Sequence, residues 1–227
     1  MTLTIYNAED IPQGSDAWLE ARRGIVTAST VGKLLTSTGK VANNDTSRAL
    51  TETLIAERIT GRVEYVHPTR DMQRGTLLEP EARRIYAEHH GPVEEIGFMR
   101  WDEEDFSLGY SPDGIAGEGL IEIKSRTPRI HLRAIYTDTV PAANMAQLQA
   151  GMLVADKPWV DYISYCPGLP LYVKRVEPIP AWQTAICDAV ARFEEVAKDQ
   201  VFEYGALTHD MPATEWWDPF DEGEEIF

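Results

Sequence analysis

The chain has 227 residues, of which 37 are acidic and 21 basic, so its formal net charge is −16. This length suits one domain with a sizeable core. The charge argues against a surface that binds nucleic acid throughout, because phosphate contacts need lysine and arginine. No apolar run is long enough for a bilayer and no secretory leader is recognisable, so we expect a cytoplasmic protein. Cys166 and Cys187 form no CxxC pair and are expected to be buried thiols rather than a disulfide or cluster site.

The charges are unevenly distributed along the chain. Acids gather at 94–95, at 102–105 and after residue 215, whereas Lys124, Arg126, Arg129 and Arg133 follow one another closely. This pattern predicts a cationic cleft within an acidic shell, which would concentrate DNA at one site.

Helices and one loop are predicted in the first part of the chain. Helices are expected over 15–22, from about 29, over 47–60 and over 77–89, with a polar loop at 36–45. Leu50, Leu54, Ile55 and Ile59 have helical spacing, and Gly61 ends that helix.

Strands dominate the rest of the chain. We expect strands at 96–101, 107–110, 120–124, 159–165 and 171–176, and helices at 143–155 and 181–202. This order predicts a mixed α/β sandwich with a single domain over 1–211. Residues 212–227 form an acidic, aromatic tail, either a solvated end or a segment that docks on a neighbouring subunit or partner.

The segment from Ser111 to Lys124 carries the clearest chemical pattern. Glu122 and Lys124 alternate on a β-prone strand and share one face, and glycines before the strand let the chain reverse and bring Asp113 beside Glu122. Two carboxylates so close would resist joint ionisation without a divalent cation, and oxygen ligands suit magnesium or manganese. An ordinary turn followed by an alternating surface strand is the alternative. The apolar neighbours Ile121 and Ile123 favour a site.

Two more polar residues are candidates for the same site. Glu79 fits a helix capping box that starts at Thr76, or it is a third acid at the first turn of a helix that faces the sheet. Gln147 lies away from the apolar stripe of the 143–155 helix more clearly than Gln149 does. A structural amide that bonds the backbone is the alternative, and proximity to the predicted site favours a role there.

Arg22, Arg23 and Ser29 form a further group. Ser29 is either a simple helix cap or part of an anion site beside an arginine, and the sequence leaves both readings open.

Five segments in this order resemble the phage lambda exonuclease and YqaJ-like viral recombinase family of the PD-(D/E)xK nuclease superfamily. They span residues 18–29, 75–79, 111–114, 122–124 and 145–149. The resemblance implies a restriction-endonuclease-like core with a central mixed β-sheet flanked by helices.

The resemblance also implies roles for individual residues. Asp113 and Glu122 would bind Mg²⁺, which Mn²⁺ could replace, together with the Ile123 backbone carbonyl. Lys124 would assist the attacking water, and Glu79 and Gln147 would complete the catalytic group.

A 5′-phosphate pocket is implied next to these residues. It maps onto Arg22, Ser29 and Ser111 with a further arginine after the catalytic strand, for which Arg129 is preferred over Arg126. Met72 falls where a family member carries an apolar wedge against the terminal base pair, although a buried packing role fits it equally.

The implied activity is 5′→3′ hydrolysis of one strand of duplex DNA, which releases 5′-mononucleotides and leaves a 3′ single-stranded tail. The family also implies a ring-shaped homotrimer, a single-strand annealing protein as partner, and a phage or prophage gene expressed in a bacterial host. Two other readings stay open: a RecB-like nuclease or endonuclease of different polarity, and a non-catalytic DNA-end-binding scaffold. The iron–sulfur branch needs four cysteines, and this chain has two.

Overall fold

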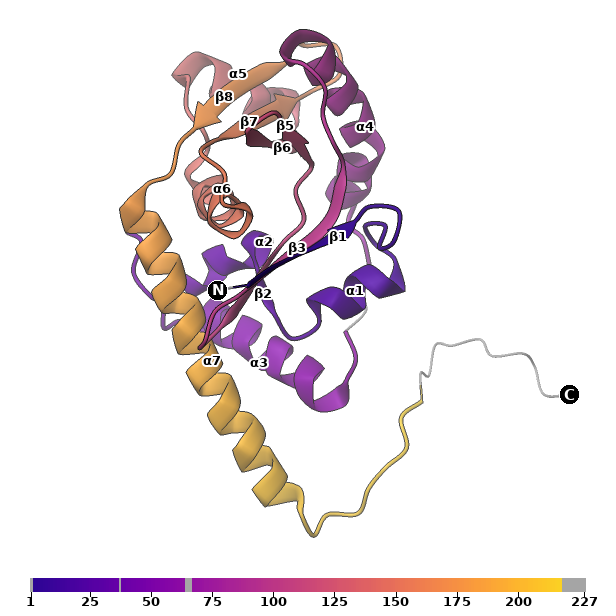
Figure 1. Cartoon of the computed structure of the whole chain (residues 1–227), viewed down its shortest axis with the longest axis vertical. Helices are drawn as coiled ribbons and strands as arrows, with labels where there is room; N and C mark the ends of the chain where they lie inside the picture. The colour runs from indigo at the N-terminus through magenta and orange to yellow at the C-terminus, as the bar shows by residue number, and fades with distance from the viewer. Residues whose placement is uncertain (1, 37, 64–66, 218–227) are drawn as a thin grey trace, which may run out of the picture.

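The computed structural model describes residues 2–36, 38–63 and 67–217, and within them the strands form two mixed sheets (Figure 1). The first sheet has the order β1 (Thr2–Asn7), β3 (Ile96–Asp102), β4 (Ser107–Tyr110) and β2 (Val26–Thr27). The second has the order β5 (Gly114–Ala116), β6 (Gly119–Ser125), β7 (Val160–Tyr165) and β8 (Tyr172–Val176). β2 runs parallel to β4 and β6 parallel to β7, while the other pairs are antiparallel. The predicted mixed α/β class is confirmed, with its strands divided between two sheets.

Helices cover and separate these sheets. They are α1 (Asp16–Arg22), α2 (Ala28–Val31), a 3₁₀ turn at Gly32–Leu34, α3 (Asp45–Thr60), α4 (Arg70–His90), α5 (Pro128–Thr137), α6 (Ala142–Ala155) and α7 (Pro180–Thr208). α6 packs against β3 and β4 of the first sheet and β7 of the second, so it lies between the sheets (Figure 1).

The strand β6 has two apolar environments, one on each face. Ile121 and Ile123 pack with Ala82 and Tyr86 of α4 in a smaller core. Leu120 packs on the opposite side, in the main core that also contains residues of α3, α6 and α7. Glu122 and Lys124 lie on the Leu120 face because side chains alternate along a strand, as the sequence predicted.

The start of α4 differs from the prediction. α4 begins at Arg70 rather than near 77, because Thr69 caps it by accepting a hydrogen bond from the Met72 backbone N–H at 3.2 Å. Thr76 therefore lies inside the helix, its hydroxyl bonded to the Met72 carbonyl, and the predicted capping box at Thr76 is wrong. Glu79 accordingly lies well beyond the first turn.

Four elements were not predicted, and α7 ends later than predicted. β2 and β5 have two and three residues, too few for an apolar alternation to be recognised. β1 does alternate polar and apolar residues, a signal that was not used in the prediction, although the strand is poorly buried. α5 starts with Pro128 in its first turn, a favoured position that we did not use. α7 runs to Thr208 although no residue after Ala197 is buried, so its last turns project from the body (Figure 1).

Three other expectations concern the cysteines, membrane-spanning helices and the C-terminal tail. Both cysteines are free thiols, as predicted, but only Cys166 is buried and Cys187 is partly exposed. No helix of the described residues is long and apolar enough to span a bilayer. In the tail predicted over 212–227, the Arg62 guanidinium lies 3.5 Å from the centre of the Trp216 ring, and residues 218–227 lie outside the described part of the chain.

Candidate active site

A hairpin between β5 and β6 brings the first two acids together. Gly117 makes its turn with a φ of +57°, a conformation that suits glycine, and Gly114 pairs with Ile121. Asp113 then lies at the open end of the hairpin, where its Oδ2 accepts a hydrogen bond from the Ile123 backbone N–H at 2.6 Å. The predicted proximity of Asp113 to the catalytic strand is confirmed.

Glu122 is the most enclosed residue of the group, with 1% of its surface exposed. Its Oε1 accepts hydrogen bonds from Lys124 Nζ and Gln147 Nε2, both at 2.6 Å, and its Oε2 accepts from the Tyr110 hydroxyl at 3.2 Å. Gln147 thus faces the site. Gln149 is buried elsewhere and bonds the backbone at 177 and 179, as the sequence predicted.

The contact between Gln147 and Glu122 depends on close packing of α6 on β4. A Cβ at Gly151 would lie 2.7 Å from Cζ of Tyr110, so a side chain there would push the helix away from the strand. Since Gln147 lies one turn before Gly151, the small residue keeps the amide within reach of Glu122.

Arg83 ties Glu79 to the hairpin. Its guanidinium forms an ion pair with Glu79 one turn earlier on α4, and its Nε donates to the Asp113 backbone carbonyl at 2.8 Å. Arg83 also pairs with Glu95 at 2.9 Å. Glu79 is therefore held next to Asp113 without a direct bond to it.

The crowding of the carboxylates changes their acidity. Burial raises the pKa of Asp113 well above its usual range, and the negative charges of Glu122 and Glu79 raise it further. Burial also raises the pKa of Glu79, an effect that Arg83 opposes and Glu122 strengthens. Burial disfavours the charged form of Lys124, but Glu122 and Asp113 outweigh it and raise the lysine pKa above its usual value.

The donors fit a hard divalent cation. Asp113, Glu122 and the Ile123 carbonyl offer oxygen atoms, and carboxylates that repel one another gain from a positive ion between them. Within the described residues, no three His, Cys, Asp or Glu side chains form a complete ligand cluster. A cation here would therefore depend on two carboxylates, a backbone carbonyl and oxygens from outside the protein, a set that suits magnesium.

These residues line one cleft of about 520 Å³. All the predicted catalytic residues border it, and so do Arg22, Ser29, Ser111 and Met72. Arg22 Nη1 donates to Ser111 Oγ at 3.5 Å, so α1 and the end of β4 supply two of the predicted phosphate ligands together. Met72 is half exposed at the cleft, which is not the buried packing position considered above.

The structure decides between the two readings of Ser29. Ser29 is not the cap of its helix, because Thr27 holds that position and bonds Thr30 Oγ1 through its backbone N–H at 3.0 Å. Ser29 is exposed at the cleft, with its hydroxyl 3.1 Å from that of Thr27.

Arg126, not Arg129, is the arginine after the catalytic strand that borders the cleft. Its Nη2 donates to Asn144 Oδ1 at 2.7 Å, whereas Arg129 is exposed on α5 and is not among the lining residues. The preference for Arg129 is therefore at odds with this geometry, because the α5 helix turns that side chain outward.

The side chains that line the cleft carry no net positive charge, contrary to the prediction of a cationic cleft. Among the described residues, its cations are Arg22, Arg74, Lys124 and Arg126, and its carboxylates are Asp71, Glu79, Asp113 and Glu122. Equal numbers cancel formally, so a bound divalent cation would make the cleft positive and attractive to phosphate.

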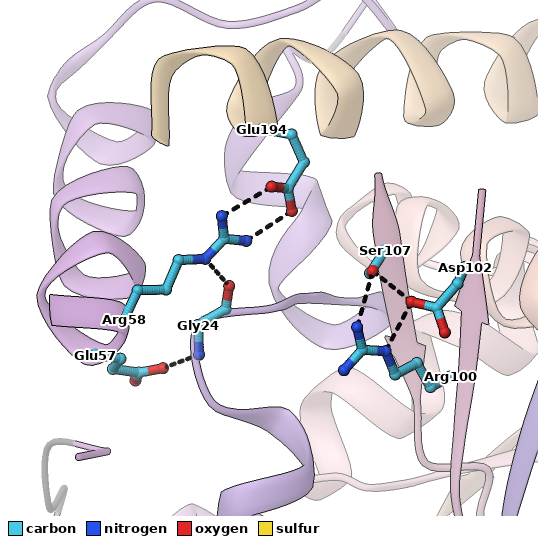
Figure 2. Close-up of polar contacts among 7 residues, drawn as sticks. All are labelled: Gly24, Glu57, Arg58, Arg100, Asp102, Ser107 and Glu194. Carbon is cyan, nitrogen blue, oxygen red and sulfur yellow. Dashed lines mark hydrogen bonds and ion pairs between the residues drawn. The ribbon is translucent and has the colours of Figure 1, made fainter. Parts of the chain in front are cut away.

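The loop that follows Arg22 is fastened on both sides (Figure 2). The Gly24 N–H donates to a Glu57 carboxylate oxygen at 2.6 Å, and the Gly24 carbonyl accepts from Arg58 Nε at 2.8 Å. Arg58 in turn makes two bonds to Glu194 of α7, at 2.8 and 2.6 Å. This Gly24 clamp (Gly24, Glu57, Arg58 and Glu194) links α3 and α7 to the segment that carries Arg22.

Sequence reasoning missed three residues of the site. Trp18 and Arg83 each lie four positions from a residue that was singled out, Arg22 and Glu79 respectively, and this helical spacing could have revealed them. Tyr110 had no local signal, since its contact with Glu122 depends on the packing of two strands from different sheets.

A protein-family model and several solved structures are similar to this chain. The YqaJ-like viral recombinase domain matches residues 17–158. An alkaline exonuclease from Laribacter hongkongensis, solved alone and with dAMP, is 30% identical, with a TM-score of 0.77 over 87% of this chain and all of that one. A phage-related exonuclease from Haemophilus somnus 129PT shares the fold at 13% identity, with a TM-score of 0.59 over 79% of this chain and 96% of that one. No curated protein sequence shows significant similarity to the chain.

The fold, the paired carboxylates of the cleft and these similarities define an enzyme of the exonuclease class, a hydrolase. The chain belongs to the YqaJ-like viral recombinase family.

Proposed function

We propose that this protein is a Mg²⁺-dependent 5′→3′ exonuclease of double-stranded DNA that releases 5′-mononucleotides and leaves 3′ single-stranded tails for annealing. The observation that carries the proposal is that one cleft contains both the carboxylate pair of Asp113 and Glu122 and the group of Arg22, Ser29 and Ser111. A strand end bound by the second group would present a phosphodiester to the first.

The side chains divide the chemistry between them. A divalent cation held by Asp113, Glu122 and the Ile123 carbonyl would supply Lewis-acid stabilisation of charge on the scissile phosphate. Lys124, held 2.6 Å from Glu122, stays protonated and offers a donor to the attacking water or to a phosphate oxygen. Gln147 and Tyr110 fix the Glu122 carboxylate through its two oxygens.

The direction of hydrolysis follows from the second group. Arg22 and Ser111 can bind a terminal phosphate dianion by charge-assisted hydrogen bonds, and Arg126 is the third cation on this side of the catalytic strand. The Laribacter enzyme has been solved with dAMP, a nucleoside monophosphate like the proposed products. Met72, half exposed at the cleft, is placed for a wedge against the terminal base pair.

The wider biological role rests on family membership. We propose a homotrimer that encircles the duplex, a single-strand annealing protein as partner, and action in the bacterial cytoplasm on behalf of a phage or prophage. The exposed apolar side chains of Phe202 and Leu207 at the end of α7, and of Met211 just after it, offer a surface for such assembly.

The test uses linear duplexes that carry either a 5′-phosphate or a 5′-hydroxyl, labelled at the 5′-terminal or the 3′-terminal nucleotide. With Mg²⁺ we expect early release of the 5′ label as mononucleotide from the phosphorylated duplex, retention of the 3′ label in long products, and no digestion in chelator. Indifference to the 5′ group, with an Arg22→Ala variant as active as wild type, would remove the basis of the proposed polarity.

The same experiment distinguishes the two alternatives. Early release of the 3′ label or internal cutting would indicate a nuclease of different polarity, and DNA binding without any hydrolysis would indicate a scaffold. The complete set of Asp113, Glu122 and Lys124 argues against the scaffold.

A further inference from the structure

Trp18 makes two contacts with the proposed phosphate site. Its indole Nε1–H donates to Ser111 Oγ at 2.9 Å, although the two residues are 93 positions apart. Its ring lies under the Arg22 guanidinium, whose central carbon is 3.8 Å from the ring centroid. One side chain therefore contacts two of the residues proposed to hold the 5′ phosphate, Ser111 and Arg22.

The contact with Ser111 decides what that hydroxyl can do. A serine hydroxyl has one proton to donate and two lone pairs to accept with. Trp18 Nε1 and Arg22 Nη1 are both donors to Oγ, at 2.9 and 3.5 Å, so they use its acceptor capacity. Among the hydrogen bonds of the described residues, none takes the Ser111 proton, which leaves it for an acceptor in the cleft.

The contact with Arg22 fixes a cation. A guanidinium that stacks on an indole face keeps its N–H groups at the edge, where they can still form hydrogen bonds. Burial lowers the pKa of Arg22 to about 10, with Glu57 opposing, so the group stays charged at neutral pH while losing water contacts. A desolvated cation of this kind binds a phosphate oxygen more strongly than a hydrated one does.

We propose that Trp18 is a positioning residue of this site, which directs the Ser111 proton into the cleft and holds Arg22 beside it, so that the site favours a terminal phosphate over a terminal hydroxyl. The inference rests on the proposed 5′-phosphate site and adds the residue that sets its specificity. Trp18 acts through Ser111 and Arg22 and takes no part in bond breaking.

The test is the substitution Trp18→Phe, which keeps an aromatic ring under Arg22 and removes the indole N–H. We expect the preference for 5′-phosphate over 5′-hydroxyl duplex ends, measured as a ratio of initial kcat/KM values, to fall about 10-fold, the loss typical of one hydrogen bond to a binding group. The rate on the 5′-hydroxyl duplex should stay within about 2-fold of wild type, since its end has no phosphate to bind.

Trp159→Phe is the matched control. The Trp159 ring also contacts an arginine, since the central carbon of the Arg175 guanidinium lies 3.5 Å from the ring centroid. Trp159 does not line the cleft. This variant should keep the wild-type preference, and both variants should be checked for unchanged thermal unfolding.

Trp18→Phe combined with Ser111→Ala tests whether Trp18 acts through the Ser111 hydroxyl. If Trp18 acts through the Ser111 hydroxyl, Trp18→Phe should lower the preference by less than about 2-fold once that hydroxyl is absent. The same 10-fold loss in both backgrounds, or equal losses on both duplex ends, would overturn the inference.

The outcomes also separate this inference from the proposed function. A wild-type enzyme that ignores the 5′ phosphate would overturn both. A wild-type preference that Trp18→Phe retains in full would overturn the inference alone and leave the proposed polarity standing.

Discussion

At the scale of single residues, the proposed catalytic group depends on charges held close together in a buried place. Glu122 receives three hydrogen bonds, from Lys124, Gln147 and Tyr110, so its carboxylate is fixed before any substrate binds. A fixed carboxylate needs no reorganisation during the reaction, which is how preorganised sites stabilise a transition state.

The first prediction concerns Lys124. Lys124→Ala should lower kcat by at least about 100-fold, because the positioned donor is lost, while the Kd for duplex ends in Mg²⁺ changes by only a few fold. Lys174→Ala is the matched control, since Lys174 also lies 2.6 Å from a carboxylate, that of Asp138, outside the cleft. Full activity of Lys124→Ala in single-turnover digestion would refute the assigned role.

The second prediction separates two neighbouring arginines. Arg126 borders the cleft and Arg129 does not, so Arg126→Ala should raise KM for a 5′-phosphorylated duplex about 10-fold or more through loss of a charge-assisted contact. Arg129→Ala should stay near wild type. The reverse order of effects would restore Arg129 as the phosphate ligand.

At the scale of elements, the position of Arg22 depends on helices distant from the chemistry. The Gly24 clamp connects α3 and α7 to the short segment between α1 and β2 (Figure 2). The Arg58 and Glu194 side chains are 26% and 9% exposed, so their ion pair is largely shielded from water. A charge left alone there would be costly.

The third prediction follows from that burial. Arg58→Ala should lower the free energy of unfolding by about 3 kcal/mol, because Glu194 would lose its partner in a buried place. Arg192→Ala removes an arginine from an exposed pair with Glu195, of 64% and 66% exposure, and should cost less than about 1 kcal/mol. Urea denaturation measures both, and equal losses would show that the clamp is not a stabilising unit.

Prediction from sequence succeeded at this scale where a pattern was local. The period of two in β6 and the helical spacing in α3 and α6 gave those elements nearly to their ends. The start of α4 was wrong because a capping box fitted Thr76 while the true cap is Thr69. β5 was not predicted because pairing with β6, rather than its own short sequence, makes it a strand. β1 was not predicted although its own sequence alternates polar and apolar residues.

At the scale of the whole molecule, the end of α7 carries apolar side chains away from the core. Phe202 is 81% exposed and Leu207 65%, on turns that project beyond the body in Figure 1. A projecting helix with such side chains favours contact with another protein surface. Assembly into the proposed trimer would cover them.

The fourth prediction tests that assembly. The double substitution Phe202→Asp and Leu207→Asp should reduce the native mass from three times 25.5 kDa to that of a single chain, since charges placed in an apolar interface are costly. Tyr136→Asp, which changes an 82% exposed aromatic residue on α5, should leave the mass unchanged. Light scattering at several concentrations measures both, and an unaltered trimer in the double variant would exclude this surface.

The sequence by itself determined the proposed catalytic hairpin, because Asp113, Glu122 and Lys124 are close along the chain and strand alternation fixes which side chains share a face. It also identified Gln147, since helical periodicity separates polar from apolar faces. Only the tertiary structure decided which arginine borders the cleft, how the charges of the cleft balance, and that Trp18 reaches Ser111. These contacts join residues far apart in the chain, and packing between elements, which no local pattern records, brings them together.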